Sequence, residues 1–578
     1  MRVLLIFFML ASASDAATYY VRADGNNGNN GLTNSVGGAW LTITYAESQA
    51  TTGDVVRVQA GTYNERVPVN ISGASDDYIT FIADGTAVCR GFDLTGVSYF
   101  RIIGFEITHT TADYSRAIAL LGTCSYIEII DNYIHETIGT AIQGRDAGLT
   151  SYITVRGNSF YLISGVPGVS TNAGTVATGL PSNLSYWLVE YNTLRRIGDG
   201  INLLGNHIIA RNNHIHEFSN ILLNTTDAYH SDIFQAGSDG VAGDVRHHVY
   251  ESNLAGNCIE TNSHYAIFQD TVADGDTNIM HRGNIAFNFG NGGIGARGTD
   301  KVVGYNNTFY KLSQASAGTA HTWYESGADY AVDGMCANSI IYDDGLGTDA
   351  LVVQSGGNSA TLTHNLGHLA GTESSYVSTN DPLFVSAATT NFFLQAASPA
   401  IDAGTNVVSV TTADASGTTF DVSDGDFLRD GYGKVDGDTI TVGGTTTRIT
   451  SIATNTVTVA DSVTWTNGMA VYWGTDTTPD IGALPYGSTK LTAATISNSG
   501  TTYTVLVSGD ARGVWFYVDG IPTTWDADSP YSAVIGSGTV SAKAYALYAQ
   551  TDPVVTATAG PWPIAPDVPP RRLWIGVP

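Results

Sequence analysis

The chain has 578 residues, a formal net charge of -28 at pH 7, and only 13% charged residues. This length exceeds what one ordinary hydrophobic core holds, so an elongated repeat fold or several domains is expected. The acidic charge excludes a general nucleic-acid surface and argues against anionic membranes, although a local Arg or a bound Ca²⁺ can still attract an anionic substrate. Gly, Asn, Thr and Ser are abundant and helix formers are scarce, which predicts an all-β protein rich in turns.

The N-terminus has the pattern of a secretory signal peptide that spans residues 1–17. Arg2 is the charged start, residues 3–10 form an apolar run, and residues 14–16 give a small-x-small cleavage site. The apolar run is too short to cross a bilayer, and no later segment is long enough. We therefore expect a secreted or periplasmic protein without membrane insertion.

A short motif that ends in Asn recurs along the chain, with a basic step of about 21–26 residues and occasional insertions. Its Asn residues are Asn132, Asn158, Asn192, Asn213, Asn253, Asn284, Asn307 and Asn338. Asn tolerates the left-handed conformation of a sharp corner, and stacked Asn side chains can bond from coil to coil. Because short apolar runs between these corners favour strands, the repeat predicts a right-handed parallel β-helix.

The ends of this repeat resemble a known group of proteins. "TYYVRADGNNGNNG", "GDVVRVQAGTYNERV" and "SGASDDYITFIADG" are similar to the start of secreted β-helix polysaccharide-degrading enzymes, including the pectate-lyase-like and the chondroitinase-B and alginate-lyase-like families. "DPLFVSAATTNFFLQAASPAIDAGT" and "PDIGALPYG" resemble the end of such a helix. The resemblance covers roughly residues 18–405 and 479–487, and it implies the fold and a carbohydrate substrate. The catalytic Lys and Arg of the chondroitinase-B group find no match here, because Lys301 and Lys311 lie outside any such motif.

Two further β segments accompany the helix of residues 18–405. Residues 406–476 alternate apolar and polar positions and predict a small inserted β module, after which residues 477–490 return to the helix end. Residues 491–560 resemble a small immunoglobulin-like β-sandwich, and residues 561–578 form a Pro-rich tail. We expect both modules to be spacers or adhesion elements. The Cys residues lie far apart without metal spacing, which predicts small buried side chains whose pairing stays open: Cys89, Cys124, Cys258 and Cys336.

Several strands align on an Ile that we place inside the helix. These residues are Ile118, Ile142, Ile201, Ile233, Ile267 and Ile294. Because side chains alternate along a strand, residues at odd offsets from this Ile should point outward. The stretch "TTDAYHSDIFQAG" then places His230, Asp232 and Phe234 on one exposed face, beside His264 and Phe268 of the next coil. The long insertion before His230 should wall this face.

The predicted site combines a base, a group that neutralises a carboxylate, and a platform for sugar. His230 is the candidate base, with His264 second. The neutralising group is Arg297 or Arg145, or a Ca²⁺ that Asp227 and Asp232 hold, although Arg297 can instead pair with Asp270 on the surface. Phe234 and Phe268 form the platform. The remaining outward polar residues bind the substrate: Asn202, Gln143, Arg145 and Asn291. His135, His214 and His216 lie beside the corners, where we expect a structural role.

These features predict a secreted, monomeric polysaccharide lyase that acts by β-elimination at a uronic-acid unit in a groove of the helix. A glycoside hydrolase on the same scaffold is the first alternative, which would pair Asp232 with Asp227, Asp199 or Glu260. A non-enzymatic adhesin or phage-type fibre that binds carbohydrate is the second. Ca²⁺ is the one cofactor expected. The identity of the polysaccharide does not follow from the sequence.

Overall fold

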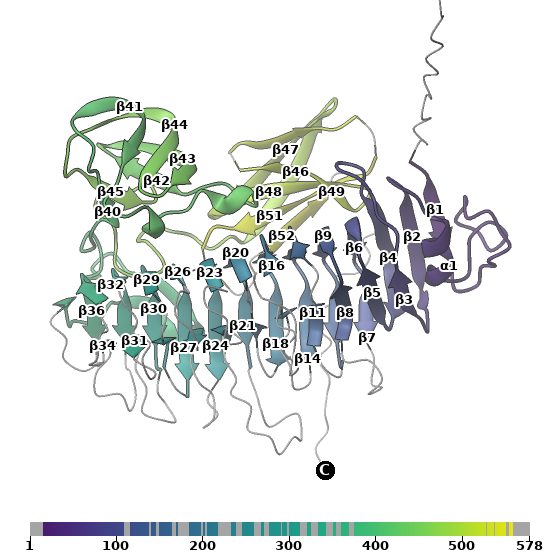
Figure 1. The fold of residues 1–578 in the computed structure, drawn as a ribbon, viewed down its shortest axis with the longest axis horizontal. Helices are drawn as coiled ribbons and strands as arrows, with labels where there is room; N and C mark the ends of the chain where they lie inside the picture. The colour runs from purple at the N-terminus through teal and green to yellow at the C-terminus, as the bar shows by residue number, and fades with distance from the viewer. Residues whose placement is uncertain are drawn as a thin grey trace, which may run out of the picture.

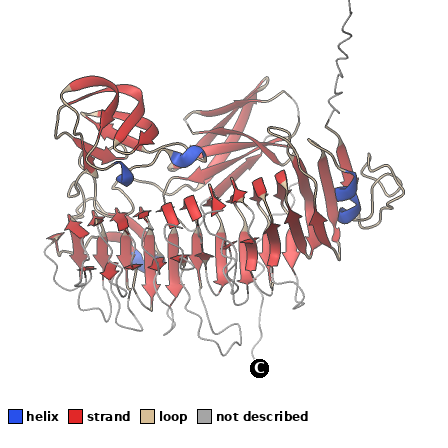
Figure 2. Ribbon diagram, in the orientation of Figure 1, coloured by secondary structure: helices blue, strands red, loops and turns tan. Residues whose placement is uncertain are grey.

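The structure is a computed structural model. It describes residues 16–108, 116–137, 140–145, 149–163, 169–170, 184–197, 200–202, 205–217, 233–237, 245–258, 267–270, 277–290, 292–297, 300–312, 321–324, 333–342, 351–353, 360–368, 375–527, 529–536, 538–548, 550 and 554–558. Strands dominate these residues, and one α-helix, α1 (Ile43–Gln49), lies near the N-terminal end (Figure 2). No helix in the described ranges has the length and apolar character to cross a membrane.

The chain winds into an elongated parallel β-helix (Figure 1). A coil carries three strands, as in β9 (Cys124–Ile130), β10 (Tyr133–His135) and β11 (Thr140–Arg145). Each strand pairs in parallel with its equivalent on the next coil. We call the surfaces formed by the series of β11, β9 and β10 the first, second and third faces.

The strands of the three faces have the following bounds. The first face contains β3 (Arg66–Val69), β5 (Gly91–Thr95), β8 (Arg116–Leu121), β11, β15 (Val169–Ser170), β19 (Ile201–Asn202), β22 (Phe234–Gly237), β25 (Ile267–Asp270), β28 (Ile294–Arg297), β31 (His321–Tyr324) and β34 (Leu351–Val353). The second face contains β2 (Val55–Thr62), β4 (Ile79–Cys89), β6 (Ser98–Ile103), β9, β12 (Thr150–Ser151), β13 (Thr154–Arg156), β16 (Leu184–Ser185), β17 (Leu188–Glu190), β20 (Gly205–Arg211), β23 (Val245–Glu251), β26 (Thr277–Arg282), β29 (Asp300–Tyr305), β32 (Gly334–Ala337) and β35 (Ala360–Thr363). The third face contains β7 (Glu106–Thr108), β10, β14 (Ser159–Ile163), β18 (Thr193–Ile197), β21 (His214–His216), β24 (Leu254–Cys258), β27 (Ile285–Phe289), β30 (Thr308–Tyr310), β33 (Ile340–Tyr342), β36 (Asn365–His368) and β37 (Tyr376–Ser378). At the N-terminal end β1 (Thr18–Val21) pairs with β2.

A ladder of buried Asn side chains joins the coils at the corner between the second and third faces. The amide nitrogen of Asn132 donates to Asn158 Oδ1 at 3.0 Å, and the same bond repeats from coil to coil as far as Asn307. This part of the predicted repeat is confirmed. The prediction that Asn338 continues the ladder is wrong, because Ser339 takes that position and its backbone N–H donates to Asn365 Oδ1 at 2.9 Å. Three of the Cys residues have the buried side chains that the sequence predicts, and they are free thiols: Cys89, Cys124 and Cys336.

The predicted alignment of the first-face strands is correct at most coils and wrong by one residue at the coil of β22. Ile142 pairs with Ile118, and Ile267 pairs with Ile294, as expected. The residue between Ile201 and Ile267 in this series is Phe234 and not Ile233. In "SDIFQAG" two adjacent apolar residues satisfy the pattern equally well, and the larger aromatic ring occupies the interior position. The odd offsets counted from Ile233 are therefore wrong for this coil.

Two antiparallel modules follow the helix. Residues 406–476, the insert module, form a six-stranded sheet with two short 3-10 turns, η4 (Gly425–Phe427) and η5 (Gly431–Gly433). Its strands are β40 (Val408–Ser409), β41 (Ala415–Asp421), β42 (Thr439–Val442), β43 (Thr445–Ala453), β44 (Thr456–Trp465) and β45 (Ala470–Trp473). Residues 491–558, the C-terminal module, form two sheets around one apolar core. Their strands are β46 (Ala493–Ser499), β47 (Thr502–Ser508), β48 (Ala511–Val518), β49 (Ile521–Asp526), β50 (Tyr531–Val534), β51 (Val540–Ala546) and β52 (Val554–Thr558). Before the insert module, β38 (Phe384–Ser386), η3 (Ala387–Thr389) and β39 (Asn391–Leu394) form a small hairpin.

Both modules lie along the second face of the helix (Figure 1). The insert module shares one apolar cluster with this face, in which Val249 and Met280 of the helix meet Val442 and Val471 of the module. In the C-terminal module, Lys543 Nζ lies 2.5 Å from Asp131 Oδ2, and Tyr191 OH donates to the carbonyl of Ala546 at 3.4 Å. The modules therefore cover the second face, a closer association with the helix than the predicted role of spacer implies.

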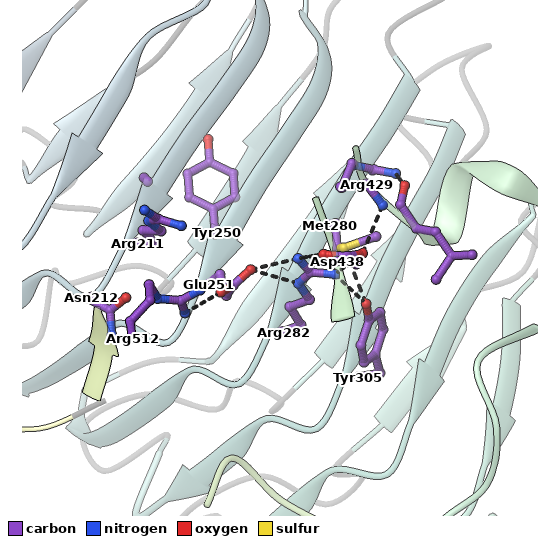
Figure 3. A network of polar contacts seen from close by, with 12 residues as sticks. Arg211, Asn212, Tyr250, Glu251, Met280, Arg282, Tyr305, Arg429, Asp438 and Arg512 are labelled. Carbon is purple, nitrogen blue, oxygen red and sulfur yellow. Dashed lines mark hydrogen bonds and ion pairs between the residues drawn. The ribbon is translucent and has the colours of Figure 1, made fainter. Parts of the chain in front are cut away.

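A buried ion network joins the helix to both modules (Figure 3). Arg282 of β26 donates to Glu251 of β23 at 2.6 Å and to Asp438 of the insert module at 2.7 Å. Arg512 of the C-terminal module donates to the other oxygen of Glu251 at 2.5 Å. Burial opposes the ionisation of Glu251, but the charges of Arg282 and Arg512 outweigh it and hold its pKa below the ordinary value. Glu251 is thus ionised at neutral pH and links the two modules through the helix.

Candidate functional site

The site predicted on the first face falls largely outside the described residues. Five of its members have no described position: His230, Asp232, Asp227, His264 and Asn291. Four others have a described backbone only, in strands of the first face: Asn202, Arg145, Phe268 and Arg297. The backbone register places Asp270 directly beside Arg297 on the next strand. The functional roles assigned to these residues stay predictions.

Two residues of the predicted site do have described side chains, and both are buried. Phe234 is 1% exposed and packs against Tyr250, with 5.1 Å between ring centroids. The prediction that Phe234 forms an exposed sugar platform is therefore wrong, because the register turns it inward. Gln143 is 6% exposed, so the prediction that it lines an open groove is also wrong. Its neighbour in the adjacent strand, Ala119, is buried as well.

A cluster of titratable side chains lies instead on the third face. His135, Tyr161, Arg195 and His216 occupy equivalent positions of β10, β14, β18 and β21, one on each coil. The preceding residue of each strand is buried: Ile134, Phe160, Leu194 and Ile215. Alternation along a strand therefore turns the four polar side chains outward. We call them the third-face row, and adjacent coils at ~4.8 Å bring neighbouring members within reach of one ligand.

Arg195 is a cation near the centre of the row. Its Nε donates to Glu217 Oε2 at 2.8 Å, and Arg196 Nε donates to the same oxygen at 3.3 Å. The guanidinium carbon of Arg195 lies 5.8 Å from the centroid of the Tyr161 ring. The side chains of Arg195 and Glu217 are 39% and 38% exposed. Among the described residues no hydrogen bond occupies the terminal nitrogens of Arg195. Glu217 thus orients a guanidinium whose outer N–H groups can bind a carboxylate.

His216 follows Arg195 on the next coil and is suited to accept a proton. Burial lowers its pKa below the ordinary 6.5; Glu217 opposes this shift, and the charge of Arg195 adds to it. The ring of His216 stacks on His214 with 4.4 Å between centroids, and its Nδ1 lies 3.9 Å from Glu217 Oε1. An imidazole with a pKa below 6.5 is neutral near pH 7, so His216 is available as a base.

The other end of the row is acidic. His135 lies between two carboxylates, with Nε2 at 3.1 Å from Glu106 Oε1 and Nδ1 at 3.4 Å from Glu136 Oε2. Tyr133, two residues earlier on β10, stacks on His135 with 4.3 Å between centroids and is 40% exposed. We call Glu106, His135 and Glu136 the acidic group.

Beyond His216 the third face is covered. The next equivalent positions are Gly256, Phe287 and Tyr310. Phe287 and Tyr310 are buried and pack against Phe392 of β39 at centroid distances of 5.8 and 5.5 Å. In the described part of the chain, the polar strip of the third face therefore spans the coils of β7 to β21.

The third-face row has a fixed spacing from the Asn ladder in the sequence. Each member is the third residue after a ladder Asn, as in "NYIH", "NSFY", "NTLR" and "NHIH". His135, His214 and His216 are predicted to serve the corners, whereas the structure places them on outward positions of the third face. His216 lies directly beside Arg195, and His214 stacks on His216. Tyr161, Arg195 and Glu217 had no place in the predicted site. A column of outward residues becomes visible only when the coils are aligned on the Asn ladder.

No group of three or more His, Cys, Asp or Glu side chains is arranged to hold a metal ion in the described ranges. The Ca²⁺ predicted at Asp227 and Asp232 would lie outside those ranges.

No protein-family model matches this chain. No curated protein matches it in sequence. Similar solved structures include pectate lyase Pel9A, at 17% identity and a TM-score of 0.41 over 68% of this chain and 93% of that one. The PL6 family alginate lyase AlyGC has 11% identity and a TM-score of 0.39 over 66% of this chain and 57% of that one. XylC, solved with xylose, has 11% identity and a TM-score of 0.40 over 79% of this chain and 100% of that one. At these values the likeness assigns no activity, and the function rests on the residues of this chain.

Proposed function

We propose that the protein is a secreted polysaccharide-degrading enzyme, a lyase that cleaves a uronic-acid-containing chain by β-elimination. One observation carries this proposal: Tyr161, Arg195 and His216 stand on three successive coils of one outward column. β-Elimination needs a cation that stabilises the charge developing on the uronate carboxylate, and a base that removes the proton on the neighbouring carbon C5. The column brings these two groups to adjacent coils.

Arg195 supplies the cation in this proposal. A guanidinium binds a carboxylate through two parallel N–H bonds, and the terminal nitrogens of Arg195 point to no partner within the described residues. Glu217 holds Nε and leaves that outer edge free. A uronate bound there places its C5, which carries the carboxylate, over the row.

His216 supplies the base. It lies one coil from Arg195, about 4.8 Å along the helix axis, which is the scale of a single sugar ring. The lowered pKa keeps the imidazole neutral near pH 7, so it can take the C5 proton. Tyr161 lies on the opposite side of Arg195, where its hydroxyl can donate a proton to the leaving glycosidic oxygen.

A glycoside hydrolase is a second candidate, and one observation favours it. Glu106 and Glu136 both approach His135, from its two ring nitrogens. Two carboxylates at roughly 5–5.5 Å or 6.5–9.5 Å hydrolyse glycosides with retention or inversion. Glu217 does not qualify as a partner, because its strand lies three coils from β10, roughly 14 Å at ordinary strand spacing.

A panel of acidic and neutral polysaccharides tests the proposal. The wild-type protein should produce the ultraviolet absorbance of an unsaturated uronate, and Arg195→Gln and His216→Gln should lose it while Arg22→Gln keeps it. Arg22 is a matched control, because it forms an exposed ion pair with Asp24 near the N-terminus. A hydrolase would instead produce new reducing ends without that absorbance, and Glu106→Gln or Glu136→Gln would stop their formation. Binding without any product would establish a carbohydrate-binding protein.

The same assay separates the two candidate locations. The site predicted on the first face requires His230→Ala and Asp232→Asn to abolish turnover. The third-face proposal requires both variants to retain it. If His230→Ala and Asp232→Asn lose turnover while Arg195→Gln retains it, the active site lies on the first face.

A further inference from the structure

Two consecutive arginines of β18 both lie on the outside of the third face. The side chains of Arg195 and Arg196 are 39% and 36% exposed, and the next residue, Ile197, is buried. Strict alternation along the strand would turn Arg196 inward. Its φ of 55° lies in the left-handed region and breaks the alternation, as it does at the equivalent positions of the two neighbouring coils, Leu162 and Glu217. The strand therefore presents two adjacent guanidiniums, of which the proposed function uses only Arg195.

The side chain of Arg196 bridges the coils on either side of its own. Its Nη1 donates to the hydroxyl oxygen of Tyr161, on β14, at 3.5 Å. Its Nε donates to Oε2 of Glu217, beside β21, at 3.3 Å. β14 and β21 both pair with β18, from its two sides. The guanidinium of Arg196 is therefore held between a carboxylate and the Tyr161 hydroxyl.

This contact determines where the hydroxyl proton of Tyr161 can point. A phenol hydroxyl carries one proton and accepts through the lone pairs of its oxygen, whereas a guanidinium only donates. Since Arg196 occupies the oxygen as a donor, the Tyr161 proton must be directed at another acceptor. Within the described ranges the Tyr161 hydroxyl donates to no residue. Its proton is therefore available to a ligand that lies on the third face.

The proposed β-elimination uses that proton and leaves a negative charge behind. His216 takes the C5 proton, the electrons of the C5–H bond form the C4–C5 double bond, and the C4–O bond breaks. The leaving oxygen takes the proton of Tyr161, so the products are an unsaturated uronate, a sugar hydroxyl, an imidazolium and a phenolate. Transfer of one proton from His216 to Tyr161 through water restores both side chains.

The phenolate would form beside two positive charges. Arg196 already donates to its oxygen, and the guanidinium carbon of Arg195 lies 5.8 Å from the centroid of the Tyr161 ring. A donor that is in place before the reaction stabilises charge as it develops, without the cost of reorganisation. Arg196 therefore favours both the direction of the proton and its departure.

We infer that Arg196 is a positioning residue, which directs the hydroxyl proton of Tyr161 at the ligand and stabilises the phenolate that the reaction leaves. This inference rests on the proposed function for the role of Tyr161 as the acid. Arg196 acts through Tyr161, because two of its donors are bound to that hydroxyl and to Glu217. Direct binding of the uronate carboxylate by Arg196 is the alternative that the experiment must distinguish.

A double-mutant cycle makes this distinction. The rates of wild type, Arg196→Gln, Tyr161→Phe and the double variant are measured on the polysaccharide that the wild type cleaves, by the absorbance of the unsaturated product. Tyr161→Phe should lower kcat at least about 100-fold, and Arg196→Gln about tenfold with KM within about twofold. The double variant should match Tyr161→Phe within about twofold, because Arg196 has no hydroxyl left to act on.

Two variants serve as matched controls. Arg22→Gln removes an exposed guanidinium near the N-terminus, and Tyr99→Phe removes a phenol hydroxyl whose ring stacks on Tyr126 in the second face. Both should keep the wild-type kcat.

A second measurement detects the contact without any turnover. Tyrosine labelled at the ring carbon Cζ gives a nuclear magnetic resonance signal for Tyr161, which is identified by its loss in Tyr161→Phe. This signal should shift in Arg196→Gln, because its hydroxyl loses the donor, and should stay in place in Arg22→Gln.

The outcomes separate the inference from the proposed lyase. A Tyr161 signal that does not move in Arg196→Gln overturns the inference whatever the activity. Losses that multiply in the double variant also overturn it, because Arg196 would then act on the substrate directly, and so does a Tyr161→Phe variant with the wild-type rate. A shifted signal in a protein that yields no unsaturated product overturns the lyase and leaves the positioning of Tyr161 by Arg196 standing.

Discussion

Two clusters of arginine and glutamate on neighbouring faces of the helix differ in their exposure to water. Under the modules, Arg282, Glu251 and Asp438 are 4%, 7% and 5% exposed. On the third face, Arg195, Arg196 and Glu217 are 39%, 36% and 38% exposed. In the first cluster Arg282 bonds to both carboxylates and to the hydroxyl of Tyr305, whereas in the second two guanidiniums share one oxygen of one carboxylate.

Arginine and glutamate therefore have different roles in the two clusters. A buried ion network is strongly destabilised when one member is lost, because the charges left behind are neither hydrated nor paired. An exposed cluster contributes little to stability, because water replaces a lost partner. Its open donors can bind an anion instead. The modules bury the first cluster against the second face, whereas the second cluster on the third face stays in contact with water.

The largest expected effect concerns the buried cluster. Arg282→Met should lower the free energy of unfolding by about 3–5 kcal/mol, because Glu251 and Asp438 would remain charged without their shared partner. Urea denaturation followed by tryptophan fluorescence measures the loss. Arg22→Met, which removes an exposed pair, should change it by no more than about 1 kcal/mol. Similar losses in both variants would contradict the distinction between the clusters.

Stability should also fall in acid, because three histidines beneath or beside the modules, two of them buried and one half-buried, are held in the neutral form. Burial lowers the pKa of His247, His248 and His281 to about 4, 3 and 3 from an ordinary 6.5. In the unfolded chain these groups bind protons below pH 6.5, whereas in the folded protein they stay neutral to much lower pH. Their contribution to the free energy of unfolding is therefore complete above pH 6.5 and is lost as the pH falls toward 3. Glu190, whose pKa is lowered to about 2 by Arg211 and Arg156 against the effect of burial, adds to the loss below pH 4.5.

We expect a loss of at least ~2 kcal/mol between pH 7 and pH 4, measured by urea denaturation at each pH. His281→Phe should flatten this profile, because neither ring nitrogen of His281 has a hydrogen-bond partner among the residues that the structure describes, and the ring stacks on Tyr250. His216→Gln on the third face should flatten it less, because that ring is 20% exposed. A profile that is flat in the wild type would contradict the burial of these imidazoles.

A smaller effect is expected from Glu217, which positions Arg195 without touching the substrate. Glu217→Gln keeps an acceptor oxygen and loses the charge, so kcat/KM should fall about tenfold, equal to 1.4 kcal/mol. The loss of the carboxylate should also make the pKa of His216 fall further, because Glu217 opposes its lowering. The acid limb of the pH–rate profile should therefore move to lower pH. A lower rate without that movement would indicate a purely structural role.

Chelation should have the smallest effect. The third-face chemistry uses Arg195 and His216 and needs no metal, so treatment with EDTA should leave kcat/KM within about twofold. Activity that is lost with EDTA and returns with Ca²⁺ would instead support the metal predicted at Asp227 and Asp232. Asp232→Asn would then distinguish a metal ligand from a solvated side chain.

The fold could be predicted from the sequence because the Asn residues of the ladder repeat at equivalent corners of successive coils. The left-handed backbone of each corner belongs to the residue before the ladder Asn, such as Asp131 or Gly157, so the predicted reason for the Asn was wrong. The candidate site was harder to predict. Alternation along a strand tells which side chains point outward only when one residue of the strand is known to point inward. At Ile233 and Phe234 two adjacent apolar residues made it ambiguous, and the register moved by one. The third-face strands are only three to five residues long at the row, too short for alternation to stand out without alignment on the Asn ladder. The covering of the second face depends on pairings such as Arg512 with Glu251, 261 residues apart, which no local pattern indicates.

The most direct measurement of the central claim is kcat/KM of Arg195→Gln on the uronic-acid-containing polysaccharide that the wild-type protein cleaves, followed by the absorbance of the unsaturated product. Removing a charged donor that stabilises developing charge should lower kcat/KM about 100-fold. The thermal unfolding midpoint should stay within about 2 °C, because the side chain is 39% exposed and its partner remains solvated. A near-native rate in this variant would contradict the assignment of the chemistry to the third face.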